Sequence, residues 1–218
     1  CVADLSNFYL DIAKDRLYVS APNDKRRRSC QTVMALIIER LAAAIAPVLC
    51  HMAEDIWQNI PYPTETESVF LSGWPTVPEE WRDDSLQAPM QELRELRAAV
   101  NKVLEECRSK RKLGASLEAA VRLEARTPAL QDALHWLQSK GDQEVDGLRD
   151  WLLVSQLQIG GEPWAELLAS DDNELAVIEV ALSRGEKCER CWHYESDIGQ
   201  HSAHPSLCGR CVSVLERR

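Results

Sequence analysis

Apolar residues recur at helical spacing through the first sixty residues, with charged residues between them. One such face runs over residues 5–18, and a second begins near Ser29, a plausible N-cap. Pro47 should end or kink the second helix, because proline lacks the amide donor and its ring clashes with the preceding turn. A third apolar face runs over residues 48–60. The pattern predicts an antiparallel helical bundle with short connections.

The pattern changes after residue 60. Residues 61–89 are rich in Pro, Thr, Glu and Trp, which predicts an irregular but packed connection. Two helices are predicted next, an amphipathic one over residues 91–112 and one opened by Pro128, and three strands are predicted over residues 116–125, 151–159 and 175–183. Residues 116–125 alternate apolar and polar, as a half-buried strand does. The order helix, strand, helix, strand, strand predicts a small α+β unit.

We therefore expect a multidomain, mainly α chain. Residues 1–88 would form a helical bundle with its connecting segment, residues 89–184 an α+β domain, and residues 185–218 a small cysteine-rich module. The last segment is too short to build an apolar core and needs another source of stability.

Composition sets broad limits. The 218 residues are 45% hydrophobic and 28% charged, which is ordinary for a globular protein, and no apolar run is long enough to span a bilayer. The formal charge of −10 argues against a general nucleic-acid coat, although local basic patches could still bind one. The chain begins at Cys1 rather than Met, so we expect it to be a piece of a longer polypeptide.

The eight cysteines fall into two groups. Cys1, Cys30, Cys50 and Cys107 are scattered through helix-like surroundings, and we expect them to be small buried side chains in a reducing compartment. The other four, Cys188, Cys191, Cys208 and Cys211, form two Cys-x-x-Cys pairs separated by 16 residues.

This second spacing is typical of a structural zinc site with four thiolate ligands. Four protein ligands leave no open position for an activated water, so the metal would be structural and the tail would need it to fold. Two disulfides or redox-active pairs are the alternatives, but redox pairs usually accompany a βαβ pattern that is missing around residue 188. His193, His201 and His204 could replace a cysteine, yet with four thiolates available we expect them at the surface.

Three residues within the two pairs could touch a nucleic acid. Trp192 either packs over the zinc site or offers a face on which a base could stack. Arg190 and Arg210 occupy matching places in the two pairs, where they could reach phosphate or a base edge or serve only as solubilising charges.

Two basic runs add further candidates. Lys25, Arg26, Arg27 and Arg28 are expected in a loop between helices. Arg108, Lys110, Arg111 and Lys112 close a long helix, where cations complement the helix dipole. The simpler interpretation of either run is a set of charges exposed to solvent. The alternative is that both runs lie beside a bound polyanion.

Several segments together resemble one family. The tail, KCERCWHYESDIG and HPSLCGRCV within residues 187–212, resembles the C-terminal zinc module of bacterial-type isoleucyl-tRNA synthetases, which are class I aminoacyl-tRNA synthetases. Segments 5–18, 45–57 and 68–75 are similar to the anticodon-binding helical domain of that class, and segment 100–125 to the junction domain that follows it. The resemblance covers nearly the whole chain in order.

The resemblance implies a function that composition does not show. Such enzymes activate isoleucine with ATP, transfer it to tRNA-Ile, and hydrolyse mischarged valine at an editing site. The HIGH and KMSKS signatures of the class are absent from this chain, and so is any editing segment. The chain would be the tRNA-reading end of a cytoplasmic, monomeric enzyme, covalently continuous with the ATP-using catalytic domain, with one structural Zn²⁺ and no membrane partner. Trp192, the two arginines and both basic runs would then face the anticodon stem-loop.

Two other readings remain open on the sequence. Formamidopyrimidine-type DNA glycosylases carry a similar four-cysteine finger, but they use an N-terminal proline and a catalytic β-domain where this chain has helices. A free-standing, zinc-stapled module that binds nucleic acid or protein without catalysis is the second.

Overall fold

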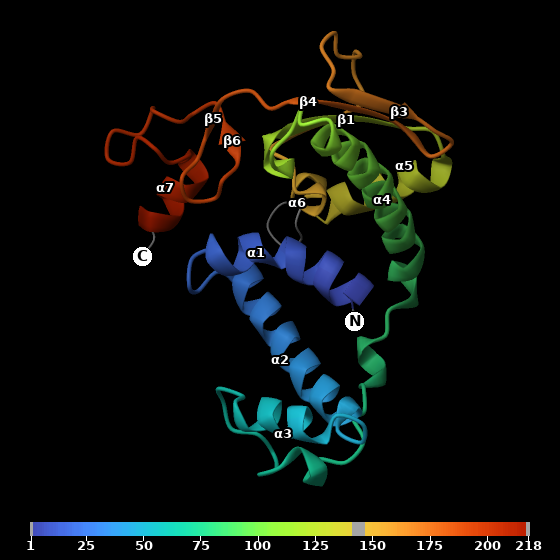
Figure 1. Ribbon diagram of the computed structural model, residues 1–218, viewed down its shortest axis with the longest axis vertical. Coiled ribbons are helices and arrows are strands. Elements are labelled where there is room, and N and C mark those ends of the chain that lie inside the picture. The colour runs from blue at the N-terminus through green and yellow to red at the C-terminus, as the bar shows by residue number, and fades with distance from the viewer. Residues whose placement is uncertain (1, 141–146, 217–218) are drawn as a thin grey trace. The chain divides into compact units, whose positions relative to one another are not determined.

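Helices dominate the fold, which confirms the mainly α class (Figure 1). The computed structural model describes residues 2–140 and 147–216. A π-helix over Val2–Tyr9 precedes the α-helices α1 (Leu10–Tyr18), α2 (Lys25–Ile45), α3 (Cys50–Gln58), α4 (Gln87–Ser109), α5 (Pro128–Ser139), α6 (Leu148–Leu152) and α7 (Gly209–Glu216). Within those ranges no helix is both long and apolar enough to cross a bilayer.

The strands form two sheets. They are β1 (Ala119–Ala125), β2 (Gln156–Ile159), β3 (Ala169–Asp172), β4 (Ala176–Leu182), β5 (Glu186–Lys187) and β6 (Tyr194–Glu195). The first four make one sheet in the order β2-β1-β4-β3, in which β1 runs parallel to β2 and antiparallel to β4. The last two pair as a short antiparallel hairpin.

The contacts divide the chain into two units. The larger unit comprises Cys1–Arg27 with Ser85–Arg218, and the smaller unit comprises Arg28–Asp84. The first predicted helix thus groups with the α+β region, whereas the sequence pattern had placed it in a bundle of residues 1–88. The physical reason is visible in its apolar face, because Ile12 is buried in the core of the α+β region and the ring of Phe8 packs edge-on against Trp151, with centroids 5.2 Å apart.

A buried arginine fixes the N-terminal segment to α4. Arg97 donates from Nη1 to the carbonyl of Asn7 at 2.9 Å and from Nη2 to Oδ2 of Asp11 at 3.1 Å. Its guanidinium also lies over the ring of Phe8. Because a buried cation without partners is costly, these bonds make the position of the segment specific.

The core of the larger unit lies between its helices and one face of the four-stranded sheet. Val121 and Leu123 of β1 and Ile178 and Val180 of β4 point to that face, and α4 and α5 cover it. The opposite face of the same strands carries Arg122 and Glu179, among other residues. The sheet therefore has one apolar face and one polar face, as period-two patterning requires.

Three features of the larger unit differ from the sequence prediction or were missed. Residues 151–159 are not one strand: α6 runs to Leu152, Leu153 adopts a left-handed conformation at φ 55°, and β2 follows. A short apolar run does not distinguish a buried helix from a buried strand. Strand β3 was missed because its sequence, Ala169–Asp172, is mostly polar at the sheet edge, and α7 was missed within the cysteine-rich tail.

The smaller unit is a compact helical element closed by an irregular segment. Its core contains Ala42, Ala46, Ala53, Trp57 and Val69. The indole of Trp57 donates to the carbonyl of Thr66 at 2.9 Å, and Glu54 accepts from the hydroxyl of Ser68 at 2.9 Å. These bonds hold the connecting segment against α3, as expected of an irregular packed connection.

Candidate zinc centre and nucleic-acid interface

The four cysteines of the tail converge on one point. Their sulfurs all lie within 4.8 Å of one another and all four side chains are buried. The sulfurs of Cys191 and Cys208 are 3.7 Å apart. Four sulfurs at about 2.3 Å from a tetrahedral zinc ion lie about 3.8 Å apart, so the arrangement fits a four-thiolate zinc site.

Local backbone structure positions the first pair. The hairpin β5–β6 leads into it, and the amide of Cys188 donates to the carbonyl of His193 at 2.8 Å. The amide of Trp192 in turn donates to the carbonyl of Cys188 at 2.9 Å, and Trp192 has a left-handed φ of 67°. This tight turn brings Cys191 back toward Cys188.

The second pair is placed by the start of α7. Asp197 reaches across the loop and its Oδ2 accepts from the amide of Gly209 at 2.7 Å. This bond is the main cause of a lowered pKa for the Asp197 carboxyl, because it stabilises the charged form. A carboxylate at a helix N-terminus also complements the helix dipole, so Asp197 holds Cys208 and Cys211 in place.

The cysteine environment favours a thiolate. Hydrogen bonds from the thiol of Cys208 and then that of Cys211 lower the pKa of Cys191, although burial opposes the shift. Zinc binds the thiolate rather than the thiol. The same hydrogen bonds with Cys191 raise the pKa of Cys208 and that of Cys211, so without a metal the cluster favours the thiolate at Cys191 alone.

The histidines occupy different environments. His193 is only 4% exposed, which corrects the expectation that it lies at the surface, and burial lowers its pKa and keeps it neutral. His201 lies 3.3 Å from Oδ2 of Asp197. Neither belongs to the group of sulfurs described above.

The two arginines of the ribbon contact the protein itself. Arg210 forms a bidentate pair with Asp15 of α1, from Nη1 to Oδ2 at 2.7 Å and from Nη2 to Oδ1 at 2.9 Å. Arg190 donates from Nη2 to the carbonyl of Val19 at 2.6 Å, and its Nη1 lies 3.6 Å from the sulfur of Cys211. Both guanidinium groups are thus engaged within the protein, and their contact with RNA stays a prediction. They fasten the ribbon to the end of α1 and place two cations beside the thiolates.

The electrostatics of Arg210 agree with this role. Burial lowers its pKa, but the hydrogen bonds and charge of Asp15 more than compensate, and the net pKa lies above the usual value. Bidentate guanidinium–carboxylate pairs are among the stronger charge-assisted contacts. Neither Asp15 nor Val19 carried any sequence signal, because Asp15 lies 195 residues from Arg210 and Val19 lies 171 residues from Arg190 along the chain.

Trp192 lies outside the core of the ribbon. It is 60% exposed, whereas the buried cluster consists of the four cysteines and Val19, with Ile198 and Leu207 packed against it. The ammonium of Lys187 lies 5.4 Å from the centroid of the Trp192 ring. Lys187 was missed from the sequence, although its position next to the first pair was a usable signal. Trp192 thus presents an aromatic face with a cation beside it.

The first basic run begins a helix rather than occupying a loop. Oδ1 of Asp24 accepts from the amides of Arg26 and Arg27 at 2.8 and 3.3 Å, so α2 starts at Lys25 and not near Ser29. Arg26 is half-buried, and that burial lowers its pKa. Arg27 donates to the carbonyl of Ser20 at 3.2 Å.

The remaining two cations of this run, Lys25 and Arg28, are exposed. Positive charges at a helix N-terminus oppose the helix dipole. The carboxylate of Asp24, which caps the helix, offsets part of this repulsion.

The second basic run is partly engaged. Lys110 pairs with Glu106, and this hydrogen bond raises the pKa of the lysine. Lys112 donates to the carbonyl of Leu168 at 2.8 Å. Arg111 turns away from the end of α4 in a left-handed conformation, with φ 55°, and is exposed.

Outside the ribbon, the scattered cysteines match the expectation only in part. Cys30 and Cys107 are buried, and Cys50 is exposed. Cys1 lies outside the described residues. Burial is the main cause of a raised pKa at Cys107, as expected of an unreactive core thiol.

Comparison with known proteins agrees with this structure. The chain is 95% identical over 218 residues to an isoleucine–tRNA ligase of Synechococcus sp. (strain CC9311) and 75% identical over 218 residues to one of Prochlorococcus marinus (strain MIT 9313), in each case over 100% of this chain. A further isoleucine–tRNA ligase, from Prochlorococcus marinus (strain MIT 9301), is 49% identical over 99% of the chain. The chain spans 22% of the length of each of these relatives.

Two family models match different parts of the chain. Residues 185–214 match the family described as a zinc finger found in FPG and IleRS. Residues 1–123 match the family described as the anticodon-binding domain of tRNA ligase. This second match covers more than half of the sequence, and the chain belongs to the family of tRNA-ligase anticodon-binding domains.

Proposed function

We propose that this chain is the tRNA-reading part of an isoleucyl-tRNA synthetase. It would bind the anticodon stem-loop of tRNA-Ile while the remainder of a longer, cytoplasmic and monomeric enzyme charges that tRNA with isoleucine at the expense of ATP. One observation carries the proposal: an exposed tryptophan with a cation beside it stands on a rigid cysteine ribbon, in a chain similar along its whole length to isoleucine–tRNA ligases.

The ribbon would owe its rigidity to zinc. Cys188, Cys191, Cys208 and Cys211 would hold one Zn²⁺, and a site closed by four thiolates has no free position for water or substrate. The metal would supply folding energy rather than chemistry. Arg190 and Arg210 would offset the excess negative charge of the four thiolates. Their bonds to Val19 and Asp15 would hold the ribbon against α1 and the residue that follows it.

Recognition would follow the usual chemistry of single-stranded RNA. An unstacked anticodon base would stack on Trp192, and Lys187 beside the ring would meet the adjoining phosphate. Arg111, Lys25 and Arg28 are exposed cations that would contact the backbone elsewhere. Residues 89–184 would act as the junction domain that carries the ribbon, residues 185–218.

The proposal is tested by binding of a labelled isoleucine-tRNA anticodon stem-loop to the zinc-loaded chain, measured by fluorescence anisotropy. Replacing Trp192→Ala should weaken binding by about 5- to 150-fold, the range expected for one stacked base. Ile159→Ala is the control, because Ile159 is also exposed, at 42%, but lies in β2, outside both family matches. A stem-loop with a different anticodon should bind more weakly.

Equal affinity for the two stem-loops, or equal effects of Trp192→Ala and Ile159→Ala, would reject anticodon reading by the ribbon. Salt dependence then separates backbone contacts from base contacts. Removing both exposed charges at the start of α2, by Lys25→Gln with Arg28→Gln, should reduce the slope of log affinity against log salt by about 1–2.

A further inference from the structure

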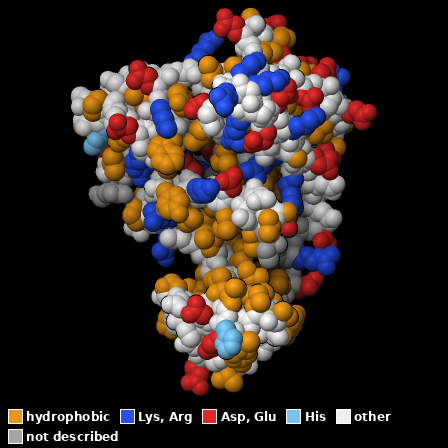
Figure 2. Space-filling view, viewed as in Figure 1, with side chains coloured by type: hydrophobic (Ala, Val, Ile, Leu, Met, Phe, Trp, Pro, Cys, Tyr) orange, Lys and Arg blue, Asp and Glu red, His pale blue; other side chains and the backbone are white. Residues whose placement is uncertain are grey.

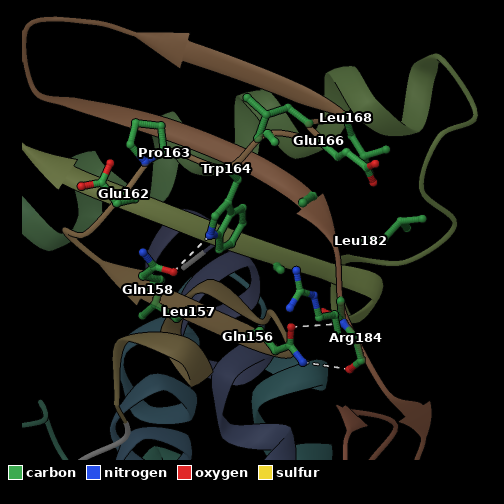
Figure 3. A pocket seen from close by; sticks show the side chains of 15 residues that line it. Gln156, Leu157, Gln158, Glu162, Pro163, Trp164, Glu166, Leu168, Leu182 and Arg184 are labelled. Atoms are coloured by element: carbon green, nitrogen blue, oxygen red, sulfur yellow. Dashed lines mark hydrogen bonds between the residues drawn. The ribbon is translucent and has the colours of Figure 1, made fainter.

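The polar face of the four-stranded sheet carries an open cavity of about 1000 Å³, shown in Figure 3. Its floor contains Ala120 of β1 and Ala181 of β4, which are paired directly across the two strands. Two residues further along the same face, Arg122 and Glu179 form a buried ion pair at 3.3 Å that fills the space above the sheet. The cavity exists because Ala120 and Ala181 have only methyl side chains, whereas longer side chains at these positions would fill the space.

One side of the cavity is a tryptophan held in a fixed orientation. The amide of Trp164 donates to Oε2 of Glu179 at 3.1 Å, and its indole Nε1 donates to Oε1 of Gln158 at 3.0 Å. The carbonyl of Gly161 accepts from Arg122 at 2.7 Å, which ties the preceding turn to the same ion pair. The polar edge of the indole is thus satisfied, and a ligand stacking on its face would break no hydrogen bond.

The other side is a wall built around Arg184. The side-chain amide of Gln156 donates to the carbonyl of Arg184 at 2.8 Å and accepts from its amide at 3.1 Å. This pair bridges β1, because β2 and β4 lie on opposite sides of that strand. In Figure 3 the guanidinium of Arg184 extends from this wall toward the indole of Trp164. Over residues 2–140 and 147–216 it has no carboxylate within ion-pair distance.

The charges along the rim orient a ligand. Glu162 lies at the other end of the cavity, beyond Trp164, and a second carboxylate of the lining, that of Glu166, lies near Leu168 (Figure 3). Arg184 is the one cation of this lining, so an anion would be attracted there and repelled by the two carboxylates. The site therefore combines a flat apolar floor, a fixed aromatic face and one unpaired cation, and these features suit a planar ring that carries a negative group.

We propose that this cavity binds a nucleotide, with its base stacked on Trp164 above Ala120 and Ala181 and its phosphate at Arg184. The volume is sufficient for a nucleotide. Such a ligand comes either from a free mononucleotide or from an unstacked nucleotide of an RNA chain. The RNA source rests on the proposed function of the chain, whereas the free nucleotide does not.

The test uses the zinc-loaded chain and the ¹⁵N–¹H signals of its tryptophan indoles, with the signal of Trp164 assigned from Trp164→Phe. One arm adds each of the four ribonucleoside 5′-monophosphates, and the other adds the isoleucine-tRNA anticodon stem-loop. The Trp164 signal should shift and saturate with at least one probe. A shift with mononucleotides identifies a free-nucleotide site, and a shift with the stem-loop alone identifies a site for a nucleotide of RNA.

Three variants locate the binding. Ala181→Leu fills the floor and should abolish the shift, because the new side chain extends into open space without disturbing the core. Arg184→Gln should weaken binding about tenfold or more, as expected for a lost charge-assisted contact. Arg126→Gln is the matched control, since Arg126 lies just beyond the opposite end of β1 and pairs with Asp172, and it should have no comparable effect.

The proposal is overturned if no probe shifts the Trp164 signal, if the shift survives Ala181→Leu, or if the control weakens binding as much as Arg184→Gln. The signal of Trp192 distinguishes this failure from failure of the proposed function. A stem-loop that shifts Trp192 but not Trp164 leaves anticodon reading intact without the cavity. A mononucleotide that shifts Trp164, with neither signal moved by the stem-loop, leaves the cavity without anticodon reading.

Discussion

The α+β region of residues 87–182 and the ribbon of residues 185–216 lie side by side in the larger unit, yet their interiors have little in common. Beneath the four-stranded sheet, aliphatic side chains of α4, α5, β1 and β4 form one continuous buried cluster, with Leu157 of β2 and Ala169 of β3 packed against it. In the ribbon the buried cluster is four cysteine sulfurs, with Val19 of the segment after α1. Apolar burial stabilises the first region by about 25 cal/mol per Å², whereas the second has almost no such surface.

The difference shows in how each region contacts α1. The α+β region buries Ile12 in its apolar core. The ribbon instead uses charge and hydrogen bonds, through Arg210 with Asp15 and Arg190 with the carbonyl of Val19. Contacts of this kind need exact geometry, so the ribbon can hold its place only while its own fold is intact.

Charged and apolar side chains are both exposed on the surface of the molecule. Figure 2 shows acidic and basic side chains intermingled over the larger unit, with apolar side chains exposed on both units. Exposed apolar residues of the smaller unit include Val48, Phe70, Leu71, Trp74 and Val77. The negative net charge is therefore compatible with RNA contacts that depend on a few local cations.

Of the changes considered, removal of zinc should have the largest effect, and it should affect the two regions differently. Chelation should unfold the ribbon and leave the α+β region folded, because structural zinc contributes about 10–16 kcal/mol to small sites of this kind. Hydrogen exchange would show lost protection over residues 185–216 and retained protection in β1 and β4. The variant Cys208→Ser should behave like the chelated protein, and Cys50→Ser, at an exposed cysteine, should not. Loss of protection throughout the larger unit would show that the two regions fold as one.

A core truncation should have the converse effect. Leu96 of α4 is fully buried under the sheet, and Leu96→Ala should lower the free energy of unfolding of the α+β region by about 2–5 kcal/mol. Zinc affinity should change little, because the lost contacts lie outside the ribbon. Denaturant unfolding of the zinc-loaded chain measures the first quantity, and competition with a chromophoric chelator measures the second. Leu182→Ala, at a 57% exposed position, is the control.

The two regions also differ in how far the sequence predicted them. In the ribbon, ligand spacing alone identified the cysteine cluster, because metal coordination imposes a fixed local pattern. In the α+β region, periodicity located α4, α5, β1 and β4, which are long and strongly patterned. It failed at α6 and β3, where a short apolar run was ambiguous and a polar edge strand carried no pattern.

Contacts between segments far apart in the chain could not be predicted from the sequence. Asp15 and Arg210 are 195 residues apart, and neither has a neighbour that marks it as a partner. Arg190 and Arg210 were therefore assigned to RNA on their position in the ribbon alone. The start of α2 was misplaced for a related reason: Asp24 caps the helix, but the basic run after it resembled a solvated loop. For Arg210 and for α2 the deciding partner was one aspartate side chain, and for Arg190 it was a backbone carbonyl.

The Arg210–Asp15 pair tests how the ribbon is held to α1. Both Arg210→Gln and Asp15→Asn should loosen the ribbon on α1, and the two changes together should cost less than the sum of their separate effects. We expect a coupling of about 1 kcal/mol, since the pair is largely but not completely buried. Zinc release to a chelator and hydrogen exchange of α1 provide the measurements. The Arg126–Asp172 pair, which joins two segments of the α+β region, is the control cycle and should leave zinc release unchanged.

The smallest expected effect is a pH dependence confined to the ribbon. The folded-state pKa of Asp197 is lowered, chiefly by its bond from the amide of Gly209. A group of this kind stabilises the fold fully above its unfolded-state pKa, and the contribution disappears as the pH falls through the folded-state pKa. Asp197→Asn should therefore weaken the ribbon by less than about 1 kcal/mol at neutral pH, because the carboxylate is 37% exposed and screened by solvent.

This effect is measurable as faster hydrogen exchange in α7 at neutral pH, where the cysteine thiolates hold the zinc. Glu195→Gln provides a control, since that carboxylate pairs with Arg149 but does not contact α7. If Asp197→Asn exchanged as slowly as the wild type and only Asp197→Ala exchanged faster, the side chain would act through shape rather than charge. In that case Asp197 would stabilise the ribbon by its fit, as packed side chains stabilise the α+β region. The metal alone would then distinguish the two regions.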